Sequence, residues 1–436
     1  MKGNFAKMSR MNPIELSLFS SRIAAVCDEM GAVLQRAALS PNIKDRLDFS
    51  CAVFDAQGLL CAQAAHIPVH LGSMAYAMRD IVENLTWRAG DMVIVNDPYL
   101  GGTHLPDVTL IAPLVMDEVL VGFVANRAHH ADIGAQSPGS MPISGRLEEE
   151  GIVIPPSYLL RAGAVQAELL DAILSKIANP GHGRGDFAAQ ISANHSGVRR
   201  LAELVREMGA AEYVRGLAAL NNYAERLALS ALREIPDGVY AFRDVMDDDG
   251  MGHSDVAIAA TVRVAAGKVH VDFAGTGALV SGNINCPLSV AAAGVYYVFR
   301  CLMPDYLPDC AGSFRPIAIS APPGCQADFF GDHLAAGQDG DILQHGLAAI
   351  AEARRLDGRD LEAAAQLVDD EGGERFAFHV LGDDQQRLAG LHHRFEQRQQ
   401  LLQTRQLLLV DQDVGVFHVD AHLVGIGDEV GRDVAA

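Results

Sequence analysis

Residues 92–134 read MVIVNDPYLGGTHLPDVTLIAPLVMDEVLVGFVANRAHHADIG, and the three apolar runs in this stretch decide the fold. Residues 92–95, 108–115 and 119–126 are short, rich in Val, Ile and Leu, and bounded by Asn, Asp or Pro. That pattern is typical of buried β-strands rather than of helices, which are usually longer. The stretch therefore predicts three strands, with an acidic turn between the last two.

Two polar loops follow these strands and carry the densest group of chemically active residues. The first contains Asp-Pro-x-x-Gly-Gly, turn chemistry that swings the backbone away from the sheet and leaves His104 and Asp107 three residues apart. The second brings His129 and His130 to the end of what we expect to be a neighbouring strand. Two imidazoles and a carboxylate suit a divalent transition metal, although the same residues could instead cap loops and bind backbone amides. We favour a metal site formed by His104, Asp107 and one of the two later histidines.

Upstream of this stretch, the sequence predicts a helix, a hairpin and a second helix. Asn12-Pro13 is a capping and first-turn signal, and apolar residues recur at roughly helical spacing through residues 12–40. Two apolar runs, residues 49–54 and 59–62, flank an Asp-Ala-Gln-Gly turn, which is a hairpin signal. Residues 72–85 then have the pattern of a helix.

Downstream of it, helices are followed by antiparallel strands. We expect helices over residues 169–179 and from residue 186 through 223 onward, the second unusually long. The glycine-rich residues 181–186 open that helix, and we interpret them as a turn; an anion-binding helix N-terminus is the alternative. The expected strands are residues 238–242, 256–264 and 268–273, and we expect a helix after them over residues 288–302.

The predicted fold class is α+β, with several regions along the chain. Residues 1–11 are expected to be a flexible N-terminus, residues 12–235 an α/β region with the metal and substrate sites, and residues 236–325 a β-rich region with a helix. Residues 326–436 contain no Pro, Ser, Lys, Asn, Met, Tyr or Trp, a set of absences unlike ordinary usage. We interpret this tract as a poorly packed product of a shifted or opposite reading frame. A helical, Gln-rich accessory domain is the alternative.

The composition disfavours several classes of protein. The chain of 436 residues has 34 Lys+Arg against 55 Asp+Glu, a formal net charge of -21, which argues against binding to nucleic acid or to an anionic membrane. It has neither a run of about 20 apolar residues that could span a membrane nor a signal-peptide pattern. Seven scattered cysteines without a C-x-x-C pair are the usage of reduced thiols, so we expect a cytoplasmic protein.

Further polar residues are candidates for catalysis. His66 and His70 are four apart, a spacing that places two ligands on one helix face, but Pro68 between them forbids a regular helix interior. The two histidines therefore either lie partly buried in a turn or have a role in the substrate site. Asp48, close to Arg46, belongs either to a surface ion pair or to a substrate site. The sequence has no P-loop, no G-x-S-x-G elbow and no motif that marks a cysteine as a nucleophile. The candidate catalytic residues are Asp48, His66, His70, Arg127 and Asp132.

Five longer segments resemble the hydantoinase B / 5-oxoprolinase family in order and spacing, over about residues 12–325. They are DRLDFSCAVFDAQGLLCAQAAHIPVHLGSM, NDPYLGGTHLPDVTLIAPL, NRAHHADIGAQSPGSMP, NPGHGRGDFAAQISANHSGVRRL and GNINCPLSVAAAGVYYVFRCL. The chain departs from the family at Gly134-Ala135, where Gly-Gly is usual. It also departs after residue 325, where the anomalous tract replaces an Asn/Pro-rich stretch and a sizeable C-terminal region.

The resemblance implies one subunit of a two-component enzyme, and hence a hetero-oligomer. A hydantoinase A-type partner would bind ATP and phosphorylate the substrate, and the B-type subunit would help to hydrolyse a cyclic amide such as hydantoin or 5-oxoproline. The related acetone carboxylases hold manganese at an H-x-x-D motif that falls on His104 and Asp107, with a further histidine that falls on His129 or His130, of which we favour His129. The resemblance therefore favours Mn, although Zn or Fe suits the same ligands. An acetone carboxylase-type subunit and an inactive, truncated remnant are the alternatives.

Overall fold

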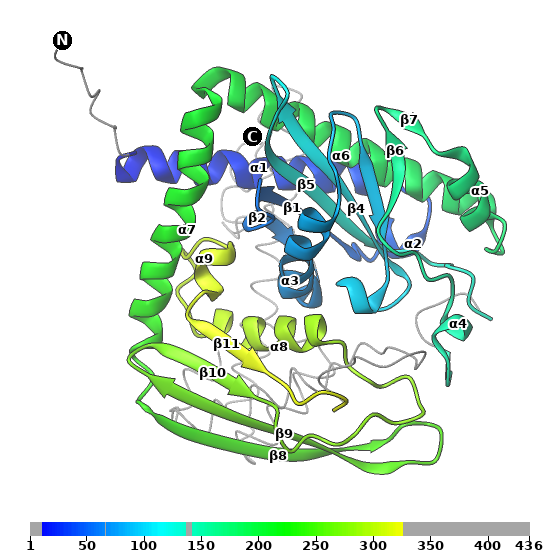
Figure 1. Ribbon diagram of the computed structural model, residues 1–436, viewed down its shortest axis with the longest axis vertical. Coiled ribbons are helices and arrows are strands. Elements are labelled where there is room, and N and C mark those ends of the chain that lie inside the picture. Colours follow the sequence, from blue (N-terminus) through cyan, green and yellow to red (C-terminus); the bar gives the residue numbers. More distant parts are fainter. Residues whose placement is uncertain (1–10, 66, 137–141, 326–436) are drawn as a thin grey trace, which may run out of the picture. The chain divides into compact units, whose positions relative to one another are not determined.

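The computed structural model describes residues 11–65, 67–136 and 142–325, and it confirms the α+β class (Figure 1). The described residues form two β-sheets with helices packed against them. The first sheet lies within the region that we expected over residues 12–235, and the second within residues 236–325.

The whole tract after residue 325 lies outside the described residues, and so does our interpretation of its reading frame. None of the described helices is both long and apolar enough to cross a membrane. The seven cysteines all lie in the described part of the chain, and none of them forms a disulfide.

The first sheet has seven strands in the order β2-β1-β5-β4-β3-β6-β7, and each neighbouring pair is antiparallel. It confirms the three strands predicted in residues 92–126 and the hairpin before them. The strands are β1 Phe49–Asp55, β2 Leu60–Ala65, β3 Met92–Val95, β4 Asp107–Met116, β5 Val119–His129, β6 Ser157–Arg161 and β7 Ala164–Val165.

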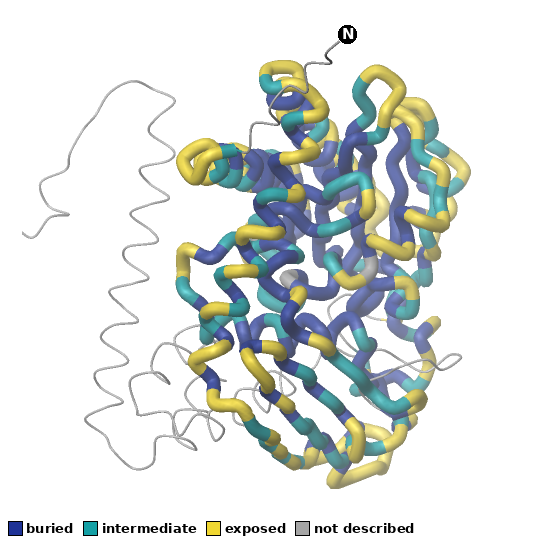
Figure 2. The backbone as a smooth tube through the Cα atoms, turned by 60° about the vertical axis from the view of Figure 1, so that its left-hand side comes forward, coloured by how far each residue is buried: buried dark blue, intermediate teal, exposed yellow. Residues whose placement is uncertain are grey.

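Helices cover both faces of this sheet. Helices α1 (Pro13–Ala37) and α6 (Pro180–Met208) lie against one face, where Val53 and Val124 are buried, and α3 (Pro68–Asn84) lies against the other, where Phe54 and Phe123 are buried (Figure 1). Successive side chains of a strand point to opposite faces, so a sheet covered on both sides needs continuous apolar runs. Figure 2 shows the result as central strands buried along most of their length.

The N-terminal signals of the first helices follow ordinary capping rules. The Asn12 side chain accepts hydrogen bonds from the Ile14 and Glu15 amides, and the Glu15 carboxylate accepts one from the Asn12 amide, which completes a capping box at α1. Helix α3 begins at Pro68 rather than at residue 72, because proline suits the first helical position. His70 therefore lies in the first turn of a helix, not in an open turn.

The single long helix expected over residues 186–223 is wrong. Gly209, with φ +89°, ends α6 and precedes α7 (Ala210–Leu232). Glycine adopts this left-handed backbone without the steric cost that other residues have, so the break occurs there.

The glycine-rich turn expected at residues 181–186 is also wrong, because this segment is the first part of α6. Pro180 occupies the first turn, and the Asn179 side chain accepts a hydrogen bond from the His182 amide. Burial of Phe187 and of residues further along the helix against the first sheet outweighs the low helix propensity of glycine.

The second sheet has four strands in the order β11-β10-β9-β8, and only β10 and β11 are parallel. Helix α8 (Leu288–Cys301) lies between this sheet and α3 (Figure 1), and a Cβ atom at Gly72 of α3 would come within 2.7 Å of the Ala293 backbone of α8. The strands are β8 Gly238–Asp248, β9 Ser254–Ala265, β10 Lys268–Asp272 and β11 Ile317–Ser320. The remaining short helices are α2 Pro41–Lys44, η1 Pro98–Leu100, α4 Leu147–Glu150, α5 Ala167–Leu174 and α9 Ala311–Phe314.

Candidate metal centre

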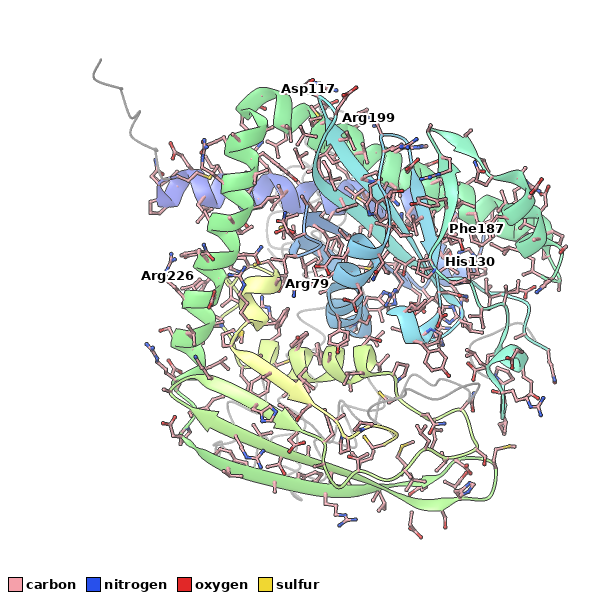
Figure 3. All side chains as sticks on the ribbon, in the orientation of Figure 1. Arg79, Asp117, His130, Phe187, Arg199 and Arg226 are labelled. Carbon is pink, nitrogen blue, oxygen red and sulfur yellow. The ribbon has the colours of Figure 1, made fainter. Side chains whose placement is uncertain are left out.

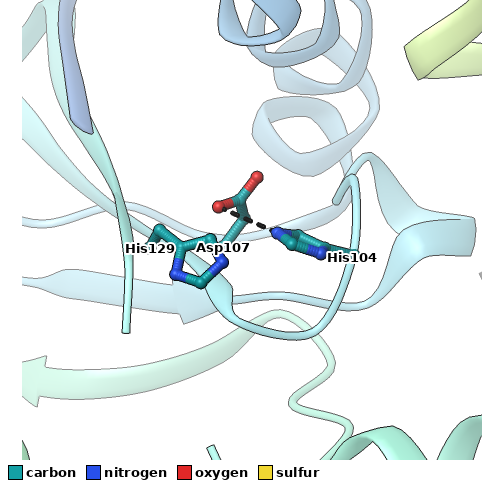
Figure 4. Close-up of side chains that lie close together, drawn as sticks. All are labelled: His104, Asp107 and His129. Atoms are coloured by element: carbon teal, nitrogen blue, oxygen red, sulfur yellow. Dashed lines mark ion pairs between the residues drawn. The ribbon is translucent and has the colours of Figure 1, made fainter. Parts of the chain in front are cut away.

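Strand pairing brings the two predicted polar loops together. Asp107 is the first residue of β4 and His129 the last residue of β5, and the register places these two residues directly opposite each other. His104 lies one turn earlier, where its carbonyl oxygen accepts a hydrogen bond from the Asp107 amide. One ligand atom from each of these three residues lies within 4.8 Å of the other two (Figure 4). All three side chains are buried.

The electrostatics of this group suit a cation. Burial disfavours the charged form of Asp107, but His104 and His70 outweigh that effect and hold the pKa of Asp107 well below its ordinary value. Burial lowers the pKa of His129 to about 4, so its imidazole is neutral near pH 7. The carboxylate form of Asp107 and the neutral form of His129 are the protonation states that metal ligands need.

The ring nitrogens of His104 are the atoms of this group that fit a bound cation best. Its Nε2 lies 3.3 Å from Asp107 Oδ1, but neither ring nitrogen makes a hydrogen bond of ordinary geometry, although the residue is only 1% exposed. A buried polar group without a hydrogen bond is costly, whereas coordination to an ion would satisfy one of these nitrogens. The residues present therefore fit a divalent metal.

The loop that carries His104 is tightly constrained by its neighbours. The Asn96 side chain is buried, donates to the Leu105 and Ile152 carbonyls and accepts from the Ile154 amide. The Gly102 amide donates to the Asp97 carbonyl, so the backbone folds back on itself. A Cβ atom at Gly102 would lie 2.3 Å from the Asn96 carbonyl oxygen, so only glycine fits.

Gly102→Ala is therefore expected to displace the His104 loop and to weaken metal binding by about 10-fold or more, the effect typical of losing support for a ligand. The measurement is the dissociation constant for Mn²⁺ or Zn²⁺ by competition with a chromophoric chelator. Gly181→Ala is the control, because a Cβ atom there meets only the Asn179 side chain, at 3.6 Å. Equal affinity of the two variants would contradict the proposed role of the loop.

A second group adjoins the first through Asp107. The ligand atoms of Asp48, His70 and Asp107 also lie within 4.8 Å of one another. His70 is fully buried, with Nε2 at 3.2 Å from Asp107 Oδ2 and Nδ1 at 2.9 Å from Ser50 Oγ. The Thr103 hydroxyl also donates to Asp107 Oδ2. The Asp107 carboxylate thus faces His104 with one oxygen and His70 with the other.

Asp48 is a partly buried neighbour of this centre. Burial and the nearby Asp107 charge raise its pKa, and its carbonyl oxygen accepts a hydrogen bond from the His129 amide. Its side chain belongs to the second group of possible ligands, and not to an exposed ion pair. His66, the other candidate from that part of the sequence, lies outside the described residues.

Three residues that we predicted to be ligands or catalytic, His130, Asp132 and Arg127, belong to neither group of possible metal ligands. His130 is not in either group: its Nε2 lies 2.9 Å from Gln190 Oε1, and its ring packs on Phe187 at 4.5 Å between centroids (Figure 3). The Asp132 carboxylate accepts hydrogen bonds from the Gly134 and Ala178 amides and so holds a loop.

Arg127 is the third of these residues, and it is buried rather than presented to a substrate. Its guanidinium donates to Thr109 Oγ1, to Ser73 Oγ and to the Gly101 carbonyl, which connects β4, α3 and the loop before His104. Burial lowers its pKa to about 10, and the Asp107 charge acts in the opposite direction. Its contacts are those of a residue that positions the loop.

The sequence analysis missed a polar ladder on α6 that supports the centre. Asp186, Gln190 and Asn194 are buried and spaced four residues apart, so they lie on one face of the helix. Gln190 donates to the Val108 carbonyl and to Asn126 Oδ1, and Asn194 donates to the Leu110 carbonyl. Polar residues at the buried spacing of a helix were the signal that could have revealed it.

Fold and site together define an α+β protein with a buried His-Asp-His centre at the ends of two paired strands. The sequence model of the family described as Hydantoinase B/oxoprolinase matches residues 12–353, and the chain belongs to that family. The match extends beyond residue 325, where we expected the resemblance to end.

Individual relatives agree with this assignment. A 5-oxoprolinase of Dictyostelium discoideum is 35% identical over 326 residues, covering 72% of this chain and 26% of the relative. The crystal structure of an ATP-dependent caprolactamase from Pseudomonas jessenii superposes with a TM-score of 0.71 at 24% identity, over 79% of this chain and 61% of that one. A nucleotide-free structure of acetone carboxylase superposes with a TM-score of 0.68 at 19% identity, over 77% of this chain and 46% of that one. These two likenesses show the fold, and the chain spans about a quarter of the 5-oxoprolinase.

Proposed function

We propose that this chain is the B-type subunit of an ATP-dependent enzyme that hydrolyses a cyclic amide such as hydantoin or 5-oxoproline. A hydantoinase A-type subunit is the proposed partner, which would bind ATP and phosphorylate the amide oxygen. The observation that carries the proposal is the buried group of His104, Asp107 and His129 in a chain of the Hydantoinase B/oxoprolinase family.

The proposed cofactor is a divalent metal, with Mn favoured by the resemblance and Zn or Fe compatible with the ligands. His104 and His129 would hold it through neutral imidazole nitrogens, and Asp107 through a carboxylate oxygen. When bound, such an ion supplies Lewis acidity, which lowers the pKa of water or polarises a substrate oxygen.

The other residues have distinct proposed roles. Asp48 places its carboxylate beside Asp107 and is the proposed acceptor of a proton from the attacking water. His70 and Thr103 both contact Asp107 Oδ2, so we assign them the positioning of that carboxylate rather than contact with the substrate. Arg127 has an indirect role: its guanidinium donates to the Gly101 carbonyl and so positions the loop that carries His104.

The direct test is reconstitution with an A-type subunit. We expect the isolated chain to open neither hydantoin nor 5-oxoproline, with or without ATP, and the two subunits together to couple ring opening to phosphate release. An amide carbonyl is a poor electrophile until its oxygen is phosphorylated, which is why ATP and the partner are both required. The measurements are product formation by chromatography and phosphate release.

Added arms of the same assay separate the alternatives. ATP-dependent consumption of a ketone only when bicarbonate is present would instead identify a carboxylase subunit. A reconstituted pair with no activity, from a chain that binds no metal, would identify the chain as a remnant. Ring opening by the isolated chain would contradict the proposed division of labour.

A further inference from the structure

A polar contact behind the candidate metal centre has consequences for how His129 could bind an ion. The side-chain nitrogen of Asn42, on the short helix α2, lies 2.8 Å from His129 Nδ1. An amide NH2 group can only donate, so in this arrangement Nδ1 accepts and the ring proton is on Nε2. Figure 4 shows one nitrogen of the His129 ring turned toward the Asp107 carboxylate, and Nδ1 is the nitrogen that contacts Asn42.

Coordination through Nε2 requires the opposite tautomer. A metal can bind only a ring nitrogen that carries no proton, so the proton of a neutral His129 must then be on Nδ1. Nδ1–H needs an acceptor, and the Asn42 side chain supplies one if its amide turns by 180° to present Oδ1 in place of Nδ2. The two ends of an amide have nearly the same shape, so the turn needs no movement of the backbone.

The surrounding contacts hold the Asn42 backbone for this task. The Asp186 carboxylate, at the start of α6, accepts hydrogen bonds from the Leu39 and Ser40 amides and so anchors the chain just before α2. The Asn42 carbonyl accepts a hydrogen bond from the Asp48 amide. One residue therefore contacts the backbone of Asp48 through its carbonyl and the ring of His129 through its side chain.

We propose that Asn42 is a positioning residue that selects the His129 tautomer able to coordinate the ion, by turning its amide from donor to acceptor as the ion binds. The proposal depends on the metal centre assigned above. It explains why a side chain with both a donor and an acceptor stands at this position: the donor stabilises the ring in the absence of metal, and the acceptor stabilises it in the complex.

The experiment compares variants of the full chain by their affinity for Mn²⁺ and Zn²⁺, measured by competition with a chromophoric chelator. Asn42→Leu, which keeps the volume and removes the acceptor, should bind each ion about 10- to 100-fold more weakly than the unaltered chain. Asn42→Asp, whose carboxylate can only accept, should bind at least as tightly as the unaltered chain. In the metal-bound unaltered chain, nitrogen-15 NMR of the histidines should show a proton on Nδ1 of His129.

Gln35 offers matched controls, because its side-chain amide also contacts α2, at the Lys44 carbonyl, without reaching His129. Gln35→Leu removes an amide and Gln35→Glu adds a charge, and neither should change metal affinity by more than about twofold. Without metal, Asn42→Leu should melt somewhat below Gln35→Leu, because it also loses the donor to His129 Nδ1. It should still unfold in one cooperative transition above the temperature of the binding assay, which separates a tautomer effect from a loss of folding.

The outcomes separate a failure of the proposed metal centre from a failure of the proposed role of Asn42. If the unaltered chain binds neither ion, the metal centre itself is wrong. If it binds an ion and Asn42→Leu binds as tightly as Gln35→Leu, the metal centre stands and the role of Asn42 is overturned. Asn42→Asp binding as weakly as Asn42→Leu, or a His129 ring protonated at Nε2 in the complex, would overturn it as well.

Discussion

Replacing Asp107 by Asn is expected to abolish specific binding of a divalent metal, with the dissociation constant rising by more than about 100-fold, beyond the range for residues that only support a ligand. Asp107 is the carboxylate of the His104–Asp107–His129 group, and an amide of the same shape lacks the negative charge that attracts the cation. The measurement is metal content after dialysis, together with chelator competition. The unaltered chain should retain about one ion.

Asp132→Asn is the control for this variant, because it removes a carboxylate that holds a loop rather than one of the grouped ligands. Its metal content should equal that of the unaltered chain. A full complement of metal in Asp107→Asn would show that the ion, if any, binds elsewhere. The same result would remove the observation on which the proposed function rests.

Gln190→Leu is expected to lower the free energy of unfolding by about 3 kcal/mol or more, without touching a proposed ligand. Gln190 is fully buried, donates to the Val108 carbonyl at 2.8 Å and to Asn126 Oδ1 at 2.9 Å, and lies 2.9 Å from His130 Nε2 through its carbonyl oxygen. Leucine of similar volume would remove these three hydrogen bonds from the core, at about 1–3 kcal/mol for each partner atom that is left unsatisfied. Urea denaturation followed by fluorescence or circular dichroism measures the change.

Ser192→Ala on the same helix is the matched control. Its hydroxyl is exposed and donates to the Ala188 carbonyl one turn back, so its loss should change the stability by no more than about 0.5 kcal/mol. A loss of less than about 1 kcal/mol in Gln190→Leu would mean that water or relaxation satisfies the exposed partners. The ladder on α6 would then not be a stabilising feature of the fold.

Sequence patterns over short stretches were enough to predict the strands of residues 92–126 and the pairing of His104 with Asp107. The apolar runs of residues 92–126 form strands because short runs between turn residues can be buried on both faces of a sheet. The loop before β4 contains Asp-Pro-x-x-Gly-Gly, whose preferred turns favour a short separation between His104 and Asp107, and contacts from Asn96 and Arg127 then hold that loop in place. Helix ends were predicted less well, since Gly209 and Pro68 set boundaries that the apolar spacing does not reveal.

The sequence by itself determined the α+β class, the strand runs and the His104–Asp107 pair, because each depends on neighbours along the chain. The resemblance only favoured His129 over His130, which are adjacent in sequence and equal in chemistry, and it is the tertiary structure that groups His129 with His104 and Asp107. The β4–β5 register places His129 opposite Asp107, whereas the next side chain points to the other face of the sheet, toward Gln190 of α6. The contact between Asn42 and His129, which are 87 residues apart in sequence, also depends on the tertiary structure. Pairing between distant segments selects which of several suitable side chains meet, and no local pattern encodes that choice.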